Sequence, residues 1–411
     1  MEKYSEYIDS GAHWLGMIPS HWDCQRSRYL LLLQSNCSCR PNKIGLENIE
    51  SFTGRYLPTE TIFDGNGTDF DKGDIVYGKL RPYLCKVWVA EFDGNAVGDF
   101  YVYRVSGVYC TDFAKYLMLS NPFTDICNAS TYGAKMPRVA HQFIASLGLP
   151  VPPLTEQQAI VSYLDDKCAK LDQLVTNKEK EIELLQEMKQ RVIADAVTRG
   201  LNPDVKFKDT DISWLPQIPE HWSSAKLKAF CKDNKEKNKG NFESKVLSLS
   251  YGRVIIKQNI NFGLVPDSYE TYQIVNPGYI ILRLTDLQND HKSLRTGLVK
   301  DRGIITSAYV ALIVNNMDST YVQHVLHSYD IMKVFYGMGG GLRQSMSYQD
   351  IANLYIPIPP IDEQKAIVAY IEERVTKIDT LAQKLQQEID SIKEYKQRLI
   401  SDVVTGQIKV C

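Results

Sequence analysis

The fold is decided by a nine-residue motif that occurs twice, as Trp14-Leu-Gly-Met-Ile-Pro-Ser-His-Trp22 and as Trp214-Leu-Pro-Gln-Ile-Pro-Glu-His-Trp222. Six of the nine positions are identical, at an offset of 200 residues. A second stretch, Leu149-Pro-Val-Pro-Pro-Leu-Thr-Glu-Gln-Gln-Ala-Ile-Val161, returns 207 residues later as Ile356-Pro-Ile-Pro-Pro-Ile-Asp-Glu-Gln-Lys-Ala-Ile-Val368. Repeats at a fixed spacing indicate repeated structural units. The 411-residue chain is therefore predicted to contain two copies of one unit.

Each proline-rich stretch is followed by a segment that predicts a long helix. Pro153 and Pro360 cannot lie inside a helix, so the helices are expected to begin after them, with Thr155 and Asp362 as N-caps. No Pro or Gly follows until Gly200 and Gly406, and glycine is a typical helix stop. Helices of this length, roughly 45 residues, span about 65–70 Å.

Apolar residues recur along both helices with alternating spacings of four and three, which is typical of a coiled-coil seam. The seam of the first helix is Leu164, Cys168, Leu171, Val175, Lys178, Ile182, Leu185, Lys189, Val192 and Ala196. That of the second is Ile371, Val375, Ile378, Ala382, Leu385, Ile389, Ile392, Lys396, Leu399 and Val403. The two helices are predicted to pair antiparallel, and the alternative is that each lies separately on its own domain. The lysines in the seam either set the register or meet a carboxylate of a partner.

The segments between the motifs predict two mixed α+β domains. Both contain alternating β-branched and aromatic stretches, which is typical of strands, and Gly73-Asp-Ile-Val76 matches Gly278-Tyr-Ile-Ile281 weakly. Short helices are expected near 112–119 and 320–335. The predicted fold class is α+β, with tandem domains, two long antiparallel helices forming a coiled coil, and an internal pseudo-twofold repeat. The predicted boundaries are 1–152 and 201–359 for the domains, and 153–200 and 360–411 for the helices.

Composition excludes several classes of protein. With 44% hydrophobic and 23% charged residues and a net charge of -2, the chain is neither disordered nor a bulk polycation. No apolar run approaches the roughly 20 residues that span a bilayer, and the first ten residues do not resemble a secretory signal. Nine cysteines without C-x-x-C spacing indicate a reducing, cytoplasmic location. Cys37 and Cys39 lack a second ligand pair, so no metal is expected.

Motifs for catalysis are missing from the sequence. There is no phosphate-binding loop of the G-x-x-x-x-G-K-[ST] type. Glu243-Ser-Lys245 with Asp233 upstream matches a nuclease pattern, but so short a match is expected by chance. His21 and His221 of the repeated motif are expected to pack rather than to act as bases. Two related domains on a rigid helical spacer are instead typical of a protein that contacts two patches of one long ligand, for which DNA is the natural candidate.

Taken together, the doubled Trp14–Trp22 motif, the doubled 149–161 stretch and the long helix after each make the whole chain similar to the specificity subunit of type I restriction-modification systems. The resemblance implies that each domain is a target recognition domain that reads one half of an asymmetric sequence in double-stranded DNA. The helices would set the gap between the half-sites. The subunit itself would catalyse nothing and bind no cofactor. Two methyltransferase (modification) subunits would use S-adenosylmethionine, and translocase/endonuclease (restriction) subunits would use ATP and Mg²⁺.

Basic and aromatic residues in predicted loops are the candidates for DNA contacts, because Arg and Lys bind guanine and phosphates while Asn and Gln bind adenine. In the first domain Lys79, Arg81 and Tyr83 are expected to alternate on one face after a strand, and a Gly/Pro loop carries Tyr132, Lys135 and Arg138. The candidates in the second domain are Tyr251, Arg253, Lys257, Arg283, Arg343 and Gln344, with Arg343 as the counterpart of Arg138.

Charge counts by segment predict modest and salt-sensitive DNA affinity for the chain alone. Residues 1–150 contain 14 basic and 16 acidic side chains, a net -2, and residues 201–355 contain 18 and 15, a net +3. Two other hypotheses stay open from the sequence. One is a stand-alone DNA-modifying enzyme that uses Glu243 and Lys245, and the other is a coiled-coil scaffold that binds only proteins.

Overall fold

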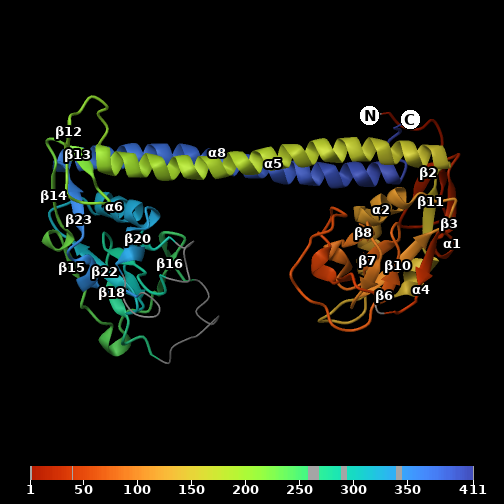
Figure 1. Cartoon of the computed structure of the whole chain (residues 1–411), viewed down its shortest axis with the longest axis horizontal. Helices are drawn as coiled ribbons and strands as arrows, with labels where there is room; N and C mark the ends of the chain where they lie inside the picture. The colour runs from red at the N-terminus through yellow and green to blue at the C-terminus, as the bar shows by residue number, and fades with distance from the viewer. Residues whose placement is uncertain (1, 39, 258–267, 288–293, 339–344, 411) are drawn as a thin grey trace. The chain divides into compact units, whose positions relative to one another are not determined.

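The computed structural model describes residues 2–38, 40–257, 268–287, 294–338 and 345–410 (Figure 1). The chain divides into two compact units. The first unit comprises Met1–Glu179 and Gln386–Cys411, and the second comprises Lys180–Leu385. Both units therefore contain a segment of each long helix, α5 (Leu154–Arg199) and α8 (Ile361–Val404). No described helix is long and apolar enough to cross a membrane.

The first unit contains the elements up to the start of α5. They are β1 (Tyr7–Asp9), β2 (Met17–Pro19), β3 (Asp23–Arg26), α1 (Ser27–Leu30), β4 (Leu31–Gln34), β5 (Lys43–Ile44), η1 (Leu46–Asn48), β6 (Thr68–Phe70), β7 (Ile75–Gly78), η2 (Pro82–Leu84), β8 (Val87–Val89), β9 (Gly94–Ala96), β10 (Phe100–Val105), α2 (Thr111–Leu119), α3 (Asn121–Ala129), α4 (His141–Ser146) and β11 (Gly148–Val151).

The second unit contains the elements between α5 and α8. They are β12 (Phe207–Asp209), β13 (Gln217–Pro219), β14 (Ser223–Lys226), η3 (Leu227–Ala229), β15 (Cys231–Asp233), η4 (Lys239–Asn241), β16 (Leu247–Ser250), β17 (Arg253–Ile256), β18 (Gln273–Val275), β19 (Ile280–Leu282), β20 (Thr296–Leu298), β21 (Gly303–Ile305), β22 (Val310–Val314), α6 (Ser319–Ile331), η5 (Val334–Gly337), α7 (Tyr348–Ile351) and β23 (Tyr355–Ile358).

Both units are built on the same four-stranded antiparallel sheet. The strand order is β4-β10-β7-β8 in the first and β15-β22-β19-β20 in the second. In the first sheet Val76 lies between Val102 and Trp88. In the second, Ile281 occupies the corresponding place between Ala311 and Gly297. The register confirms the weak match between residues 73–76 and 278–281, because both segments lead into the third strand of their sheet.

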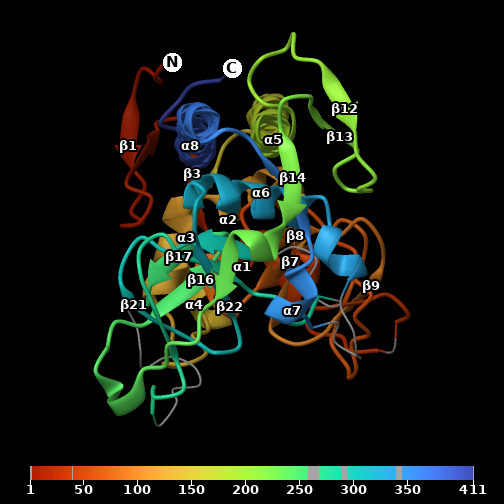
Figure 2. The same ribbon diagram turned by 90° about the vertical axis from the view of Figure 1, so that its left-hand side faces the viewer.

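The two faces of each sheet pack into different cores, because successive side chains of a strand point to opposite faces. Ile75 of β7 joins a core with α2 and both long helices, whereas Val76 joins a separate core with β5 and β6. Ile280 and Ile281 divide in the same way in the second unit. Figure 2 shows α6 between the second sheet and the long helices, where the Tyr321 hydroxyl donates to the Val197 carbonyl.

The predicted N-caps of the long helices are wrong. Helix α5 begins at Leu154 and α8 at Ile361, one residue before Thr155 and Asp362. The Pro153 and Pro360 carbonyls accept the first helical hydrogen bonds, from the main-chain nitrogens of Gln157 and Gln364, each at 2.9 Å. The prolines themselves therefore occupy the capping positions, which leaves Thr155 and Asp362 inside the first turn.

Gln157 and Gln364, at equivalent positions of the repeat, stabilise these helix starts through their buried side chains. Each side-chain amide donates to a proline carbonyl of the preceding stretch, at 2.9 Å in both cases. Each amide oxygen accepts a main-chain N–H from its domain, that of Cys110 at 2.7 Å or that of Asp318 at 2.9 Å. The Gln of the repeated stretch thus joins the helix start to the domain on which it lies.

The predicted seam is confirmed, since none of its twenty side chains is solvent-exposed. In the first unit Asp172 pairs with Lys396 at 2.6 Å and Lys178 pairs with Glu388 at 2.5 Å. The residue numbers of successive contacts thus increase along α5 and decrease along α8. The helices are therefore antiparallel within that unit. In the second unit Lys189 pairs with Asp379 at 2.7 Å. Each seam lysine thus meets a carboxylate on the other helix of the same chain.

Candidate nucleic-acid interface

The repeated histidines lie in a structural contact that is the same in both units. His21 Nε2 is 2.8 Å from Glu156 Oε2, and His221 Nε2 is 2.9 Å from Glu363 Oε2. Both glutamates lie in the first turn of a long helix. The motif beginning at Trp14 and its copy therefore hold the helix starts, but the two histidines are exposed and do so through a polar contact rather than by the expected packing.

The structure brings the two candidate loops of the first domain together, although about 50 residues separate them in the sequence. Leu80 and Arg138 form a β-bridge. The Arg81 nitrogen donates to the Pro137 carbonyl at 2.7 Å, and the Val139 nitrogen donates to the Lys79 carbonyl at 3.1 Å. The connection that follows β7 and the loop that precedes α4 therefore form one surface.

Several predicted contact residues on this surface are exposed to solvent. The exposed set is Arg81, Tyr83, Tyr132 and Lys135. The Lys79 ammonium instead lies over the Tyr101 ring, 5.1 Å from its centroid. The expected alternation of Lys79, Arg81 and Tyr83 on one strand face is wrong. Arg81 adopts a left-handed conformation with φ of +51°, and Pro82 then begins the 3-10 turn η2.

Arg138 is held by an ion pair inside this surface. Its Nε and Nη2 atoms donate to the two carboxylate oxygens of Asp99, at 2.8 and 2.9 Å. The Arg138 guanidinium lowers the pKa of the Asp99 carboxyl. The pair fixes the loop that carries Tyr132 and Lys135, because the Arg138 main chain also exchanges two hydrogen bonds with Tyr132. A contact of Arg138 with DNA would compete with this bidentate pair.

In the second domain three candidates lie on or beside the β16–β17 hairpin. Ser250 pairs with Arg253, so Tyr251 and Gly252 form the two-residue turn, with φ of +47° and +74°. Positive φ at both central residues is typical of a type I′ hairpin turn. Tyr251 is 89% exposed at the tip. The Arg253 guanidinium lies 3.7 Å from Asp379 of α8, and Lys257 follows the end of β17.

Arg283 follows β19 directly and occupies the position that Gly78, the last residue of β7, has in the first domain. Its nitrogen donates to the Arg295 carbonyl at 2.8 Å, as the Gly78 nitrogen does to Lys86. The turn at Gly252 packs against Leu294, so the hairpin tip and Arg283 lie at the same end of β20. Arg343 and Gln344 lie outside the described residues, and the equivalence of Arg343 with Arg138 stays a prediction.

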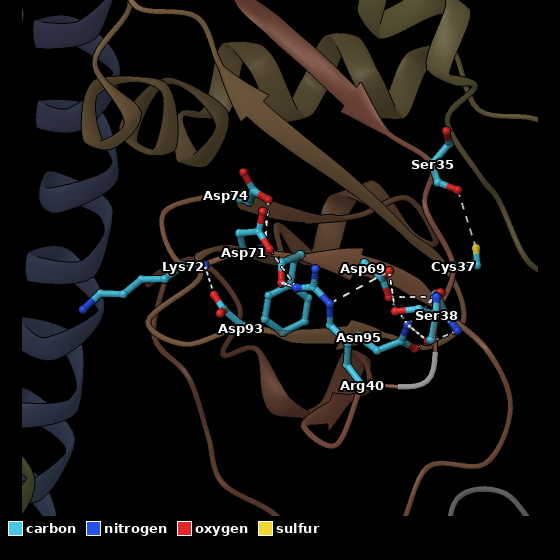
Figure 3. A network of polar contacts seen from close by, with 12 residues as sticks. Ser35, Cys37, Ser38, Arg40, Asp69, Asp71, Lys72, Asp74, Asp93 and Asn95 are labelled. Carbon is cyan, nitrogen blue, oxygen red and sulfur yellow. Dashed lines mark hydrogen bonds and ion pairs between the residues drawn. The ribbon is translucent and has the colours of Figure 1, made fainter.

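A buried polar network in the first domain has no signal in the sequence (Figure 3). Asp69 accepts hydrogen bonds from the Ser38 hydroxyl at 2.7 Å and the Asn95 amide at 2.9 Å. Although burial alone would raise it, the pKa of Asp69 is lowered by these hydrogen bonds. Arg40 pairs with Asp71 at 2.8 Å and extends the network. The network joins the segment after β4 to β6 and β9, and its members are too far apart in the sequence to form a motif.

The nuclease-like residues do not form a catalytic arrangement among the described residues. Glu243 accepts hydrogen bonds from the main-chain nitrogens of Ser244 and Lys245, both at 3.1 Å. These hydrogen bonds, that from Lys245 first, lower the pKa of Glu243 although burial opposes them. The Lys245 ammonium lies 4.0 Å from Asp301, while Asp233 pairs with Lys235. The Glu243 carboxylate therefore caps its own turn.

Two copies of one domain that present different basic and aromatic loops define a tandem recognition protein. A family model described as the type I restriction modification DNA specificity domain matches residues 59–184 and 219–391, which is more than half of the chain. The chain therefore belongs to this family of DNA specificity domains of type I restriction-modification systems.

The chain is similar to curated specificity subunits in sequence and to a solved structure in fold. The EcoDI specificity subunit of Escherichia coli is 29% identical over 207 residues, which are 48% of this chain and 46% of that protein. The chain thus spans about half the length of that relative. The MjaVIII specificity subunit of Methanocaldococcus jannaschii is 24% identical over 100% of this chain and 98% of its own. A chain from a solved structure of the type I restriction-modification system has the same fold, with a TM-score of 0.70 at 17% identity, over 95% of this chain and 99% of that one.

Proposed function

We propose that each domain reads one half of an asymmetric, bipartite target in double-stranded DNA, and that the antiparallel helices set the number of unread base pairs between the halves. The observation that carries the proposal is the doubled sheet. The strand order and register are the same in both domains, whereas the side chains on the connections at the strand ends differ. One scaffold with two different loop sets suits two different half-sites.

The exposed loop residues suit direct contact with DNA. In the first domain Arg81 is the candidate for guanine, and Lys135 and Tyr132 are candidates for phosphates. Lys79, Tyr83 and Arg138 border the same surface. In the second domain Tyr251, Arg253, Lys257 and Arg283 take these roles, together with Arg343 and Gln344. The net charge of this chain is close to zero, so partner subunits would supply part of the positive charge that binds the DNA phosphates.

The helical pair would dock two methyltransferase subunits. Support comes from apolar side chains that remain exposed on the helices at repeat-equivalent positions. Leu174 corresponds to Leu381 and Met188 corresponds to Tyr395, both at the 207-residue offset, and all four are exposed. Exposed apolar residues at repeated positions favour two copies of one partner.

The chemistry of the complex would belong to the partners. The methyltransferase subunits would use S-adenosylmethionine to methylate adenine, and translocase/endonuclease subunits would use ATP and Mg²⁺ to complete the restriction enzyme. We place the complex in the cytoplasm. Seven cysteines of the described chain are free thiols, among them the buried Cys85, Cys127, Cys168 and Cys231, which suits a reducing compartment.

Replacing one domain tests the proposal. The chain would be expressed with a methyltransferase partner, and methylated adenines would be mapped by single-molecule sequencing. Exchange of residues 1–152 for the equivalent domain of a relative is expected to replace one half-site and keep the other. An unchanged target would favour the scaffold hypothesis. DNA modification by the purified chain alone, abolished by Glu243→Ala, would favour the enzyme hypothesis.

The length of the helices gives a second test of the same proposal. Removal of one heptad from each helix, in the stretch 171–192 of α5 and its antiparallel partner in α8, keeps the seam in phase. We expect both half-sites to be retained and the gap between them to shorten. An unchanged gap would contradict the role of the helices as a spacer.

A further inference from the structure

The residue directly before the last strand of each sheet is a cation in both domains. Lys86 precedes β8 and Arg295 precedes β20. The two positions are equivalent, because each carbonyl accepts a hydrogen bond at 2.8 Å from a residue at the end of the preceding strand, from Gly78 as the last residue of β7 or from Arg283 directly after β19. Charged side chains at such internal positions are costly unless they are fully hydrogen-bonded. The hydrogen-bond partners of these two cations therefore indicate what each one does.

Arg295 is completely buried, and its guanidinium binds main-chain carbonyls. Its Nη1 donates to the carbonyl oxygens of Arg283 and Thr285 at 3.1 and 2.9 Å, and its Nη2 donates to that of Asp286 at 3.3 Å. Its Nε donates to the Tyr336 hydroxyl at 3.2 Å. A planar guanidinium with several fixed donors can hold a short loop in one conformation. Arg295 thus holds the described residues 283–286, which directly follow β19.

This connection contains a left-handed residue, Asp286, with φ of +58°, a conformation that aspartate tolerates better than most other residues. A second anchor lies on the other side of Arg295, whose main-chain nitrogen donates to the Asp330 carboxylate of α6 at 2.6 Å. Arg295 therefore connects the loop after β19 to the helix that packs beneath the long helices.

Lys86 binds carbonyls as well, but of a different segment. Its ammonium donates to the carbonyl oxygens of Leu46 and Ile49, at 2.7 and 2.5 Å, and so holds the turn η1. Burial lowers the pKa of Lys86. The turn lies against the end of β7, since a Cβ added to Gly78 would be 3.0 Å from Leu46 Cδ2. Lys86 thereby supports the connection that starts at Lys79 and carries Arg81 and Tyr83.

We infer that Arg295 and Lys86 are positioning residues for DNA reading, each holding the loop that follows the third strand of its own sheet. The inference rests on the proposed function, because the loops matter only if each domain reads a half-site. Arg295 acts on the loop directly through its carbonyls, whereas Lys86 acts through a neighbouring turn. The same position thus supports the equivalent loop in both domains, directly in the second and through η1 in the first.

Methylation mapping of the full chain with its methyltransferase partner tests the inference. Arg295→Lys is the main variant, because lysine already occupies this position in the first domain, and its single ammonium nitrogen lacks the planar fork with which Nε, Nη1 and Nη2 of Arg295 reach separate partners. We expect methylation of the intact target to fall at least tenfold, with degenerate bases accepted only in the second half-site. Lys86→Met is expected to allow degenerate bases only in the first half-site and to leave the second half-site unchanged. Arg302→Lys, at an exposed ion pair with Glu243, is the matched control and is expected to leave both half-sites unchanged.

Each other outcome overturns the inference. If both variants methylate the same target sequence as the wild type and to the same extent, the two cations only stabilise the fold. Equal loss of both half-sites, or loss of the assembled complex, in Arg295→Lys would show a general structural role. A modest fall of the melting temperature with an intact complex is expected for Arg295→Lys, because the ammonium keeps the charge but loses some of the hydrogen bonds of the buried guanidinium. If the wild-type chain itself yields no bipartite methylation, the proposed function fails, and this result is separate from any effect of the variants.

Discussion

The two domains share the same strand order and the same sheet register, but the connections at the ends of their strands carry different side chains. In the first domain the third strand is followed by a 3-10 turn with Arg81 and Tyr83 exposed. In the second, the equivalent connection starts with Arg283 and lies beside a hairpin tipped by Tyr251. The difference shows that the sheet and its attachment to the helices form a constant scaffold, whereas the connections are free to diverge.

The two buried tryptophans that attach the domains give the largest expected effect. Trp22 and Trp222 are both almost fully buried against a long helix. Trp22→Ala and Trp222→Ala are each expected to lower the free energy of unfolding by about 3–5 kcal/mol, as is usual for large core truncations. Urea denaturation of the purified variants measures the loss. A change below about 1 kcal/mol in either variant would contradict the equivalent packing of the two tryptophans.

Acidification is expected to distinguish the domains. Burial lowers the pKa of His324 and His327 in α6 to about 4. Unfolding restores the ordinary pKa near 6.5, so the unfolded state binds more protons between these values and stability falls as the pH is lowered through that window. We expect a loss on the order of 1–2 kcal/mol per histidine at pH 5.

The measurement is hydrogen exchange of the two domains between pH 7 and pH 5, corrected for the intrinsic exchange rate. The second domain should lose protection before the first, where burial lowers the pKa of the partly buried His141 to a smaller extent. A double His324→Gln, His327→Gln variant is the control and should remove the difference. Earlier loss of protection in the first domain would contradict the expectation.

The glycines that end the long helices should respond unequally to alanine. Gly200 and Gly406 are both left-handed, with φ of +77° and +76°. A Cβ on Gly406 would lie 2.4 Å from Pro19 Cδ, whereas one on Gly200 would lie 3.1 Å from the Trp222 ring. We expect Gly406→Ala to cost about 2–3 kcal/mol and Gly200→Ala about 1–2 kcal/mol, as measured by thermal unfolding. Equal costs would show that the closer contact relaxes freely.

The two helical ion pairs offer the smallest expected difference. Asp172 accepts from Lys396 and from Arg55, both at 2.6 Å, whereas Asp379 has Lys189 at 2.7 Å and Arg253 only at 3.7 Å. Asp172→Asn is therefore expected to lower the free energy of unfolding by about 1–2 kcal/mol, and Asp379→Asn by about 1 kcal/mol or less. Asp166→Asn, in an exposed pair within α5, serves as the control. A larger loss from Asp379→Asn would reverse the ranking.

Much of the fold was predictable because it follows from periodicity and repetition. The seam, the helix ends at Gly200 and Gly406 and the relation between residues 73–76 and 278–281 each have a local pattern. The N-caps were misplaced by two residues, since the sequence shows that proline cannot lie within a helix but not that its carbonyl can accept the first helical hydrogen bond. The sequence shows that Gln157 and Gln364 occupy equivalent positions of the repeat. It does not show that their side chains hold the helix starts.

The candidate interface was predictable only as residue types. Sequence patterns singled out the loops at Lys79 and Tyr132, but only the β-bridge between Leu80 and Arg138 shows that they form one surface. The pairing of Arg138 with Asp99 depends on residues 39 positions apart on different elements. Lys86 and Arg295 gave no signal, because their roles come from main-chain carbonyls, which every residue has.

The central claim, that each domain reads its own half-site, is tested most directly by a chain that carries the first domain twice. Residues 201–359 would be replaced by a second copy of residues 1–152, with both long helices kept, and adenine methylation would be mapped in cells that contain the methyltransferase partner. The account predicts an inverted repeat of one wild-type half-site, with the other half-site gone. Methylation of the original asymmetric target by this chain would contradict it.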